Sequence, residues 1–367
     1  MKIICNTDLL NQACQNVQRV VSSKTTIPAL EGILMKAEGG QLHLTGYDLE
    51  VGINTTLDVK IEEEGSIILN ARILCDILRR LPGENVRIEA DERQLCVIRC
   101  GEVEYKLVGI AAEEYPELPA ITGTQPVLID SDVLGNMVRQ TIFAVSTNDT
   151  KMVHTGVKFE ISADKLRLVA VDGFRLAIRT EEIKYSGEEL SFVVPSKTLS
   201  EVVKLLDSSE VVSVNVAKRH IIFEIGSYSI ISRLLDGEFL DYNAAVPKKF
   251  STNVTVNVKT FVDAIERTSL LITDRLKSPL RCVFDDNVIK ISTTTSLGTA
   301  NDRIPAKVEG ERVEIGFNNR FLLDAFRACS LDEVKVTLNG SLSPITIVPP
   351  EGDKFLFLVL PVRLRNE

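Results

Sequence analysis

The feature that most constrains this 367-residue chain is a charged pattern that occurs three times at nearly equal spacing. Each copy has a basic residue, an acidic residue four positions later and a second basic residue seven positions after the first. The copies are Arg72/Asp76/Arg79, Lys197/Glu201/Lys204 and Arg320/Asp324/Arg327, which begin 125 and 123 residues apart. Positions i and i+7 of a helix lie two turns apart on one side. The spacing therefore predicts a threefold repeat in which every copy presents two cations on one helix face.

Two helices are expected in each repeat, because apolar residues recur with the helical period of 3.6 in six segments. The predicted helices span residues 7–24, 71–80, 131–145, 195–206, 257–275 and 317–329. Thr7 or Asp8 is the expected N-cap of the first helix. Beside the first charged triad, the predicted buried stripe is Ile73, Leu74, Ile77, Leu78 and Leu81. The charged residues lie off this stripe.

Strand patterns with a period of two follow the first helix of each repeat. They cover Leu42–Ile53, Leu166–Ile178 and Ile289–Asp302, and each contains two strands around a short break. Further strand pairs close the repeats, such as Val86–Ala90 with Gln94–Arg99. Residues typical of linkers gather at Tyr115–Pro126 and Tyr242–Thr252. The expected class is α+β with mainly antiparallel sheets, in three domains at residues 1–121, 126–247 and 251–367.

The charge distribution divides the chain into basic helices and an acidic remainder. The six predicted helices contain 13 basic and 8 acidic residues, a net charge of +5, although the whole chain has −9. Basic helices backed by acidic sheets are typical of a protein that holds a polyanion on one side. Nucleic acid bound through phosphates, without base reading, is the favoured ligand because no base-reading motif is present. The alternative is that each triad is a solvated face whose acids pair with its own cations.

Other polar groups are interpreted as structural. The seven cysteines predict reduced core residues, although Cys96 and Cys100 would alternatively suit a metal pair. Asp285-Asp286-Asn287 predicts a tight turn, with a Mg²⁺ site as the alternative. No histidine lies in a catalytic motif, so no enzyme activity, cofactor or metal is expected. A cytosolic protein is expected, because no apolar run approaches the roughly 18 residues of a membrane span.

Three sequence segments resemble motifs of one known family. These are Leu44-Thr45-Gly46-Tyr47-Asp48-Leu49-Glu50, Val171-Asp172-Gly173-Phe174-Arg175-Leu176-Ala177 and Leu360-Pro361-Val362-Arg363-Leu364. Together with the three repeats, they closely resemble the bacterial DNA polymerase III β subunits, the replicative sliding clamps. The resemblance covers nearly the whole chain. It implies the DNA clamp fold and a head-to-tail homodimer that forms a ring with helices inside and sheets outside.

The resemblance also implies a function and a DNA-facing surface. A ring of this kind encircles double-stranded DNA, slides without sequence preference and tethers a DNA polymerase as a non-catalytic processivity factor. By position in the family, the residues implied to face DNA are Lys24, Arg72, Arg79, Arg80, Asn148, Lys197 and Lys204. The charged pattern adds Arg320 and Arg327.

A hydrophobic pocket between the second and third repeats is implied to bind a short peptide of the replicative polymerase, clamp loader and repair proteins. Carried over from the family, it comprises His154, Val171, Gly173, Phe174, Arg175, Leu176, Leu240, Leu342, Pro344, Leu360, Pro361, Val362 and Arg363. Several positions depart from the family pattern, including Phe174 for His and Leu360 and Val362 for Met. Residues Arg365-Asn366-Glu367 extend past the usual end.

A dimer interface is expected between an edge strand of the first repeat and one of the third. Its predicted residues are Glu104, Lys106, Val108, Leu271, Ile272, Leu297 and Arg303. The competing hypotheses are a peptide-binding scaffold without a DNA role and, more remotely, a Mg²⁺-dependent nuclease or nucleotidyltransferase. No membrane partner is expected, and the expected location is the bacterial cytoplasm, at replication forks of the nucleoid.

Overall fold

The computed structural model describes residues 1–367 except 23, 122–124, 208–209, 274–277 and 365–367. The chain forms two compact units. Unit 1 comprises Met1–Asp132 and Lys197–Leu234, and unit 2 comprises Val133–Ser196 and Leu235–Glu367. The division runs through the predicted second repeat, because one sheet of that repeat continues a sheet of the first and the other continues a sheet of the third.

Unit 1 contains two antiparallel sheets. The five-stranded sheet has the order β5 (Lys60–Glu63), β1 (Lys2–Asn6), β7 (Asn85–Ala90), β8 (Leu95–Cys100) and β9 (Val103–Val108). The eight-stranded sheet has the order β10 (Val127–Asp130), β15 (Val211–Val216), β16 (His220–Ile225), β17 (Tyr228–Arg233), β4 (Val51–Asp58), β3 (Gln41–Tyr47), β2 (Gly32–Glu38) and β6 (Gly65–Asn70). Pairing of β17 with β4 joins the first two repeats.

Unit 2 also contains two antiparallel sheets. The nine-stranded sheet has the order β14 (Leu190–Pro195), β11 (Gly156–Ile161), β12 (Lys165–Val171), β13 (Arg175–Glu182), β26 (Phe355–Val359), β25 (Ile345–Val348), β24 (Glu333–Leu338), β18 (Thr252–Asn257) and β22 (Lys307–Gly310). The four-stranded sheet has the order β21 (Gly298–Pro305), β20 (Val288–Thr295), β19 (Leu280–Asp285) and β23 (Val313–Phe317). Pairing of β13 with β26 joins the last two repeats.

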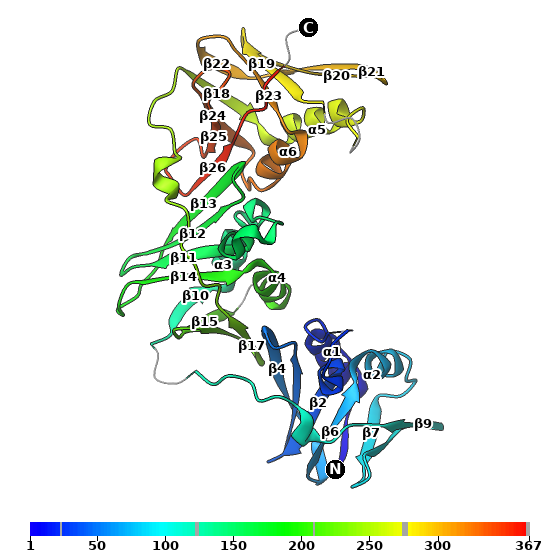
Figure 1. The fold of residues 1–367 in the computed structure, drawn as a ribbon. Helices are drawn as coiled ribbons and strands as arrows, with labels where there is room; N and C mark the ends of the chain where they lie inside the picture. The colour runs from blue at the N-terminus through cyan, green and yellow to red at the C-terminus, as the bar shows by residue number, and fades with distance from the viewer. Residues whose placement is uncertain (23, 122–124, 208–209, 274–277, 365–367) are drawn as a thin grey trace. The chain divides into compact units, whose positions relative to one another are not determined.

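The predicted helices are all present, two in each repeat. They are α1 (Thr7–Gln18), α2 (Ala71–Leu78), α3 (Ser131–Arg139), α4 (Ser196–Leu205), α5 (Val258–Ser269) and α6 (Asn319–Arg327). Short 3₁₀ segments occur at η1 (Pro28–Glu31), η2 (Ala112–Glu114), η3 (Ile142–Ala144), η4 (Asp149–Thr155) and η5 (Tyr242–Ala244). Figure 1 shows α1 beside α2 in unit 1 and α5 beside α6 in unit 2. Each pair covers the sheets of its unit.

Asparagine caps mark where strands change into helices. The N-cap of α1 is Asn6, whose side chain accepts a hydrogen bond from the Leu9 amide at 3.0 Å. The expectation of Thr7 or Asp8 was therefore wrong by one or two residues. Asn70, Asn257 and Asn318 cap α2, α5 and α6 in the same way. Each such cap stabilises its helix by roughly 1 kcal/mol because it satisfies an otherwise unpaired amide.

Three predicted helices end earlier in the structure than the apolar period indicated. The first stops at Gln18 instead of residue 24, and the third stops at Arg139 and resumes as η3. In the third helix, Thr141 Oγ1 donates to the carbonyls of Met137 and Val138 at 2.8 and 3.2 Å. Thr268 near the end of α5 makes equivalent bonds. Such bonds compete with the helical backbone pattern. The predicted end of the fifth helix, at residue 275, lies outside the described residues.

The predicted strand pairs are confirmed. Each of the three long patterns is a hairpin, formed by β3 with β4, β12 with β13 and β20 with β21. The turn interpretation of Asp285-Asp286-Asn287 is also confirmed. Asp286 and Asn287 have φ values of 47° and 58°, as the tight turn between β19 and β20 requires.

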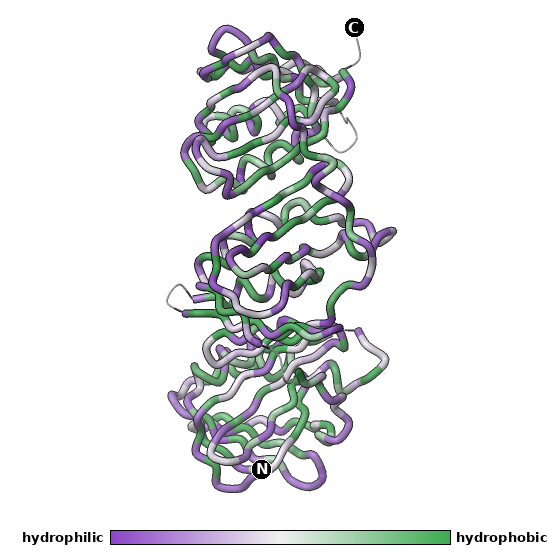
Figure 2. Tube along the Cα trace, turned by 90° about the vertical axis from the view of Figure 1, so that its left-hand side faces the viewer, coloured by the Kyte–Doolittle hydropathy of each residue, from purple (hydrophilic) through white to green (hydrophobic). Residues whose placement is uncertain are grey.

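The cores are formed by the apolar side chains of the predicted strand pattern. Figure 2 shows hydrophobic stretches along the strands and helices and hydrophilic stretches at many outlying turns. All seven cysteines are free, and six are buried, as predicted. Burial raises the pKa of the Cys96 thiol to about 12, which makes it unreactive. Two stripe residues depart from their prediction, because Ile73 is 49% exposed and Leu81 is only half-buried. No helix among the described residues is long and apolar enough to cross a membrane.

Candidate nucleic-acid interface and peptide pocket

The three charged triads lie on equivalent helices, α2, α4 and α6, except that Arg79 is the C-cap directly after α2. In each helix the first cation is the second residue, so Arg72, Lys197 and Arg320 occupy the first turn. All six triad cations are exposed. A cation in the first turn opposes the helix dipole and costs about 0.3 to 1 kcal/mol. This arrangement therefore does not stabilise the helices, which favours a ligand-binding role over a purely structural one.

The acidic residues of the triads test the alternative hypothesis, in which each triad is a solvated face whose acids pair with its own cations. Asp76 pairs with Arg79 at 3.4 Å, and Glu201 pairs with Lys204 at 2.7 Å. In the third triad, Arg327 instead pairs with Glu266 of α5 at 2.6 Å. The self-paired alternative therefore accounts only for the second cation of the first and second triads. Arg72 forms no ion pair with any of the described residues, and exposed pairs contribute only about 0 to 1 kcal/mol.

Two further residues of the predicted DNA-facing set do not lie on helices. Lys24 is exposed but follows the end of α1, where its backbone bonds the Ser22 side chain. Asn148 is exposed and caps η4, and its Oδ1 accepts from the Thr150 amide at 3.0 Å. The predicted helix 7–24 is thus wrong at its end, whereas Asn148 lies beyond the predicted helix 131–145. Lys197 has a partner in unit 1, the carboxylate of Asp48, which sits at the turn after β3.

The predicted peptide pocket has a floor of packed apolar side chains in unit 2. Val171, Leu176 and Leu358 pack with Val169 and the buried ring of Tyr242, and Leu360 packs against this group. Strands β13 and β26 place Leu176 opposite Leu358. The Leu360 amide continues the ladder by donating to the Phe174 carbonyl at 2.8 Å. The structure therefore brings together the predicted floor residues of the second and third repeats.

The rim of this floor is apolar and open. Phe174, Leu240, Leu342 and Val362 are 59%, 44%, 73% and 41% exposed. Gly173 has a φ of +89° in the turn before β13, a conformation that favours glycine. Pro344 and Pro361 are half-buried and Arg363 is exposed. Exposed apolar groups around a packed floor fit the apolar side chains of a bound peptide.

Three of the predicted residues line a separate part of the surface. A cleft of about 610 Å³ is bordered by Leu342, Val362 and Arg363, together with Arg281, Glu314 and Gly316. Phe174 and His154 do not line it. The C-terminal segment forms one wall and is bonded to β23 by the Val362 amide, which donates to the Gly316 carbonyl at 2.8 Å. The predicted residues thus form a floor with an open rim and an adjoining cleft.

Arg175 connects the pocket to α6. Its Nε donates to Asp172 at 2.8 Å and its Nη1 to Asp324 at 2.6 Å. Its guanidinium lies 4.6 Å from the ring centroid of Phe321, which also stacks on Phe174. The sequence reasoning missed Phe321 and the pocket-side role of Asp324. A signal was available, since Phe321 is an aromatic residue within a charged triad.

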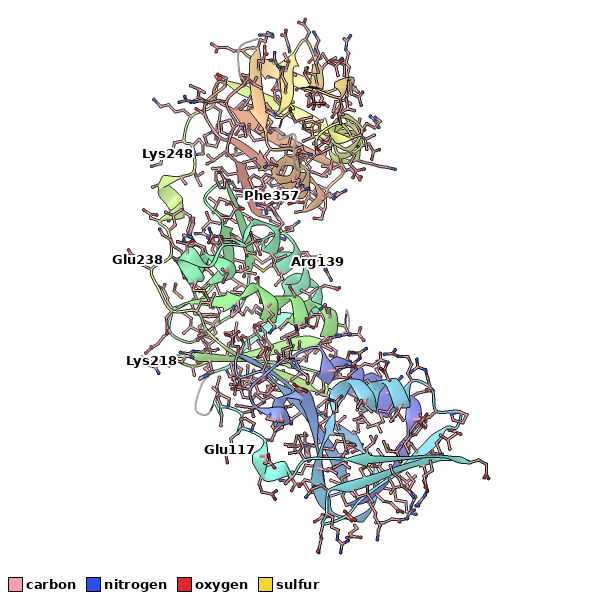
Figure 3. All side chains as sticks on the ribbon, turned by 45° about the vertical axis from the view of Figure 1, so that its right-hand side comes forward. Glu117, Arg139, Lys218, Glu238, Lys248 and Phe357 are labelled. Atoms are coloured by element: carbon pink, nitrogen blue, oxygen red, sulfur yellow. The ribbon has the colours of Figure 1, made fainter. Side chains whose placement is uncertain are left out.

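The connection that carries Leu240 is fixed by a polar network. The Tyr242 hydroxyl donates to Glu160 at 2.6 Å, and Lys158 binds the same carboxylate at 2.7 Å. Burial raises the pKa of Tyr242, and its bond to Glu160 adds to this. Burial also works to raise the pKa of Glu160, but hydrogen bonds from Lys158 and Tyr242 outweigh it and lower that pKa. Figure 3 shows Glu238 and Lys248 on this connection and Arg139 on the opposite, helical side of unit 2.

Most of the predicted interface residues lie at two free sheet edges, and two follow α5. Glu104, Lys106 and Val108 are on β9, where Val108 is 84% exposed. Glu104 pairs with Arg99 at 2.7 Å and with Lys106 at 3.2 Å. Leu297 and Arg303 lie at the turn before β21 and on that strand, and both are exposed. Leu271 and Ile272 are half-buried after α5, and their neighbour Leu270 is 80% exposed.

Comparisons with known proteins agree with this architecture. The family models of the DNA polymerase III beta subunit match in three parts: the N-terminal domain at residues 1–119, the central domain at 128–241 and the C-terminal domain at 243–363. The beta sliding clamp of Bacillus subtilis is 34% identical, over 99% of this chain and 100% of that protein.

Solved structures agree with the sequence comparison. The sliding clamp structure of Bacillus subtilis has a TM-score of 0.97 and covers 100% of both chains at 34% identity. A sliding clamp of Pseudomonas aeruginosa bound to griselimycin has a TM-score of 0.93 at 28% identity, over 99% of this chain and 100% of that chain. The chain therefore belongs to the DNA polymerase III beta subunit family, the beta sliding clamps, which are non-catalytic processivity factors of DNA polymerase III.

Proposed function

We propose that two copies of this chain close head to tail into a ring that encircles duplex DNA. The ring slides without sequence preference and tethers the replicative polymerase. Each copy contributes three clamp domains, at residues 1–121, 126–247 and 251–367. The protein works in the cytoplasm, at replication forks of the nucleoid.

The order of the strands in the sheets is the observation that supports the proposal. The nine-stranded sheet of unit 2 combines four strands of the second repeat with five of the third. It does so by pairing β13 with β26, as unit 1 pairs β4 with β17. The five-stranded sheet ends at β9, the counterpart of β17 and β26, and the four-stranded sheet ends at β21, the counterpart of β4 and β13. Pairing β9 of one copy with β21 of another completes a nine-stranded sheet and removes both exposed edges.

The register of this pairing follows from the two junctions within the chain. Ser232 lies opposite Val51, and Val359 lies opposite Arg175. Transfer of this register by the repeat places Tyr105 opposite Ala300 and Glu104 opposite Asn301. Glu104 and Arg303 then share one face as diagonal neighbours, at a spacing where opposite charges attract. The charges of the two edges are thus complementary.

The helical cations give the ring its grip on DNA. Arg72, Lys197, Lys204, Arg320 and Arg327 lie on the equivalent helices α2, α4 and α6. Arg79 and Arg80 directly follow α2, and Lys24 and Asn148 lie in exposed segments after α1 and α3. We assign all nine to phosphate contact, which positions DNA without reading bases. Retention comes from ring closure, while these contacts keep the DNA near the helices.

The apolar rim of the pocket recruits partners. A linear peptide with Leu or Phe anchors would cover Phe174, Leu240 and Val362, which are all exposed next to the packed floor. The proposed owners of such peptides are the replicative polymerase, the clamp loader and repair proteins. Apolar anchors in a preformed pocket provide most of the affinity of interactions of this kind.

The test is retention on DNA of different topology. Protein loaded on a closed circle should stay bound through gel filtration and should leave once the circle is cut with a restriction enzyme. Equal retention on circular and linear DNA would overturn the ring. Direct, unloaded binding should weaken as salt rises, because phosphate contacts release counterions. A peptide-binding scaffold without a DNA role would lack this salt slope.

A further inference from the structure

The tips of three equivalent hairpins carry an exposed apolar residue. Leu49 lies between β3 and β4, Phe174 between β12 and β13, and Leu297 between β20 and β21. They follow one another at intervals of 125 and 123 residues, the same intervals as the charged triads. Their exposed fractions are 49%, 59% and 65%. The hairpin turns align as Asp48–Val51, Asp172–Arg175 and Thr295–Gly298, so Phe174 and Leu297 occupy the same third position of the turn, whereas Leu49 occupies the second, like Gly173.

Two of these tips contact the first turn of the second helix of the next repeat. In unit 1, the Asp48 carboxylate beside Leu49 binds Lys197 of α4. In unit 2, the ring of Phe174 stacks on Phe321 of α6, with centroids 5.9 Å apart. An ion pair again accompanies the contact, between Arg175 and Asp324 at 2.6 Å. A hairpin tip against a helix start is thus a recurring element of the junctions between repeats.

Among the residues that the structure describes, the turn at Leu297 and the start of α2 make no such contact within the chain. Ile73 occupies the third position of α2, as Thr198 does in α4 and Phe321 does in α6. Thr198 is fully buried, whereas Ile73 is 49% exposed. The apolar period predicts that Ile73 is covered, and within one chain it is not. Leu297 is likewise uncovered, and its turn, Thr295 to Gly298, contains no ionisable residue.

We propose that Leu297 of one copy packs on Ile73 of a second copy, so that the junction between copies is latched by an apolar contact. This rests on the head-to-tail dimer proposed above. Both junctions within the chain contain an ion pair, Asp48 with Lys197 and Arg175 with Asp324, whereas the junction between copies has Leu against Ile. Salt weakens exposed ion pairs but not apolar contacts. The dimer's tip contact is therefore insensitive to salt.

A charge exchange tests this pairing. Leu297→Glu and Ile73→Lys should each weaken the dimer, and the double variant should restore it by placing opposite charges together. A closed ring of two copies has two identical junctions, so a tenfold loss at one junction becomes about a hundredfold rise in dimer Kd. Sedimentation equilibrium measures the Kd. Leu9→Lys is the matched control, because Leu9 is 56% exposed on α1 and lies at no hairpin tip.

Each outcome has a distinct meaning. Restoration by the double variant, with a dimer Kd that now rises with salt, supports the contact. If the wild-type protein is monomeric, the ring of the proposed function fails and this inference fails with it. If the wild type is a dimer and the single variants behave like Leu9→Lys, only this inference is overturned. Weakening without restoration places both residues in the interface but apart, and also overturns their pairing.

Discussion

At the residue scale, Arg175 is held by several contacts at once. It is surrounded by two carboxylates and the Phe321 ring, and its side chain is only 10% exposed. Replacement by Ala would leave Asp172 and Asp324 facing each other without their cation. We expect Arg175→Ala to reduce the free energy of unfolding by about 3 kcal/mol, because a partly buried pair loses one partner. Urea titration followed by circular dichroism measures this loss.

Arg139→Ala provides the matched control in unit 2. Arg139 is exposed, and its guanidinium donates to Asn136 at 3.3 Å. Its removal should change the free energy of unfolding by less than about 0.5 kcal/mol. Equal effects of the two substitutions would show that the contacts of Arg175 contribute nothing beyond those of an exposed arginine.

We predict that His154, whose ring packs edge-on against Phe239 beside the pocket floor, gives peptide binding a pH dependence. Burial, and to a smaller extent Lys151, holds the pKa of His154 below its ordinary value of 6.5. A bound peptide would desolvate the ring further, so binding favours neutral imidazole. Affinity for a polymerase peptide should therefore be level above about pH 7 and fall as the pH drops below about 6.5. Fluorescence anisotropy with a labelled peptide measures this.

The same titration with His154→Gln should be flatter, because the titrating group is gone. His220→Gln serves as the control, since His220 lies on β16 in unit 1. An unchanged pH profile in the His154 variant would assign the pH dependence to another group.

At the element scale, the second helices carry cations where helix electrostatics disfavours them. Arg72 and Arg320 are in the first turns of α2 and α6, near unpaired amides. Arg72→Glu should leave folding intact or stabilise α2 by about 0.5 kcal/mol, because an acid suits this end. It should weaken DNA binding and reduce the salt slope by at least about one. Filter binding over a series of salt concentrations measures the slope.

Arg93→Glu is the control for the change of charge. Arg93 is exposed in the turn between β7 and β8 and lies on no helix. If it lowers DNA affinity as much as Arg72→Glu, then net charge, and not the helix face, governs binding.

The residues at which the helices end depend on individual side chains, which the apolar period does not take into account. The apolar period located all six helices, since it reflects the face that each helix buries. It extended the helix after Ser131 to residue 145, whereas Thr141 diverts backbone carbonyls and stops it. It also assigned Ile73 to the core, although in a single chain nothing covers that residue. The apolar period shows which residues are suited to burial, but not whether the residues that bury them belong to the same chain.

At the scale of the whole molecule, the register between copies can be tested by cross-linking. Tyr105→Cys combined with Ala300→Cys should form disulfide-linked dimers on mild oxidation, because the proposed pairing places these residues opposite each other. Lys106→Cys with Ala300→Cys should cross-link poorly, since neighbouring strand residues point to opposite faces. Non-reducing gel electrophoresis separates the species. Efficient cross-linking of the second pair would shift the register by one.

The sequence by itself determined the repeat, the α+β class, the helices and hairpins, and the helix position of five triad cations, while the sixth, Arg79, is the C-cap of α2. These are set by local periodicity and by spacing along the chain, which a sequence displays directly. Only the tertiary structure decided the partners: Asp48 for Lys197, Asp324 and Phe321 for Arg175, and Tyr242 for Glu160. Each of these contacts joins residues at least 75 positions apart in the chain. Such pairings depend on how strands of successive repeats align, and no local pattern encodes that alignment.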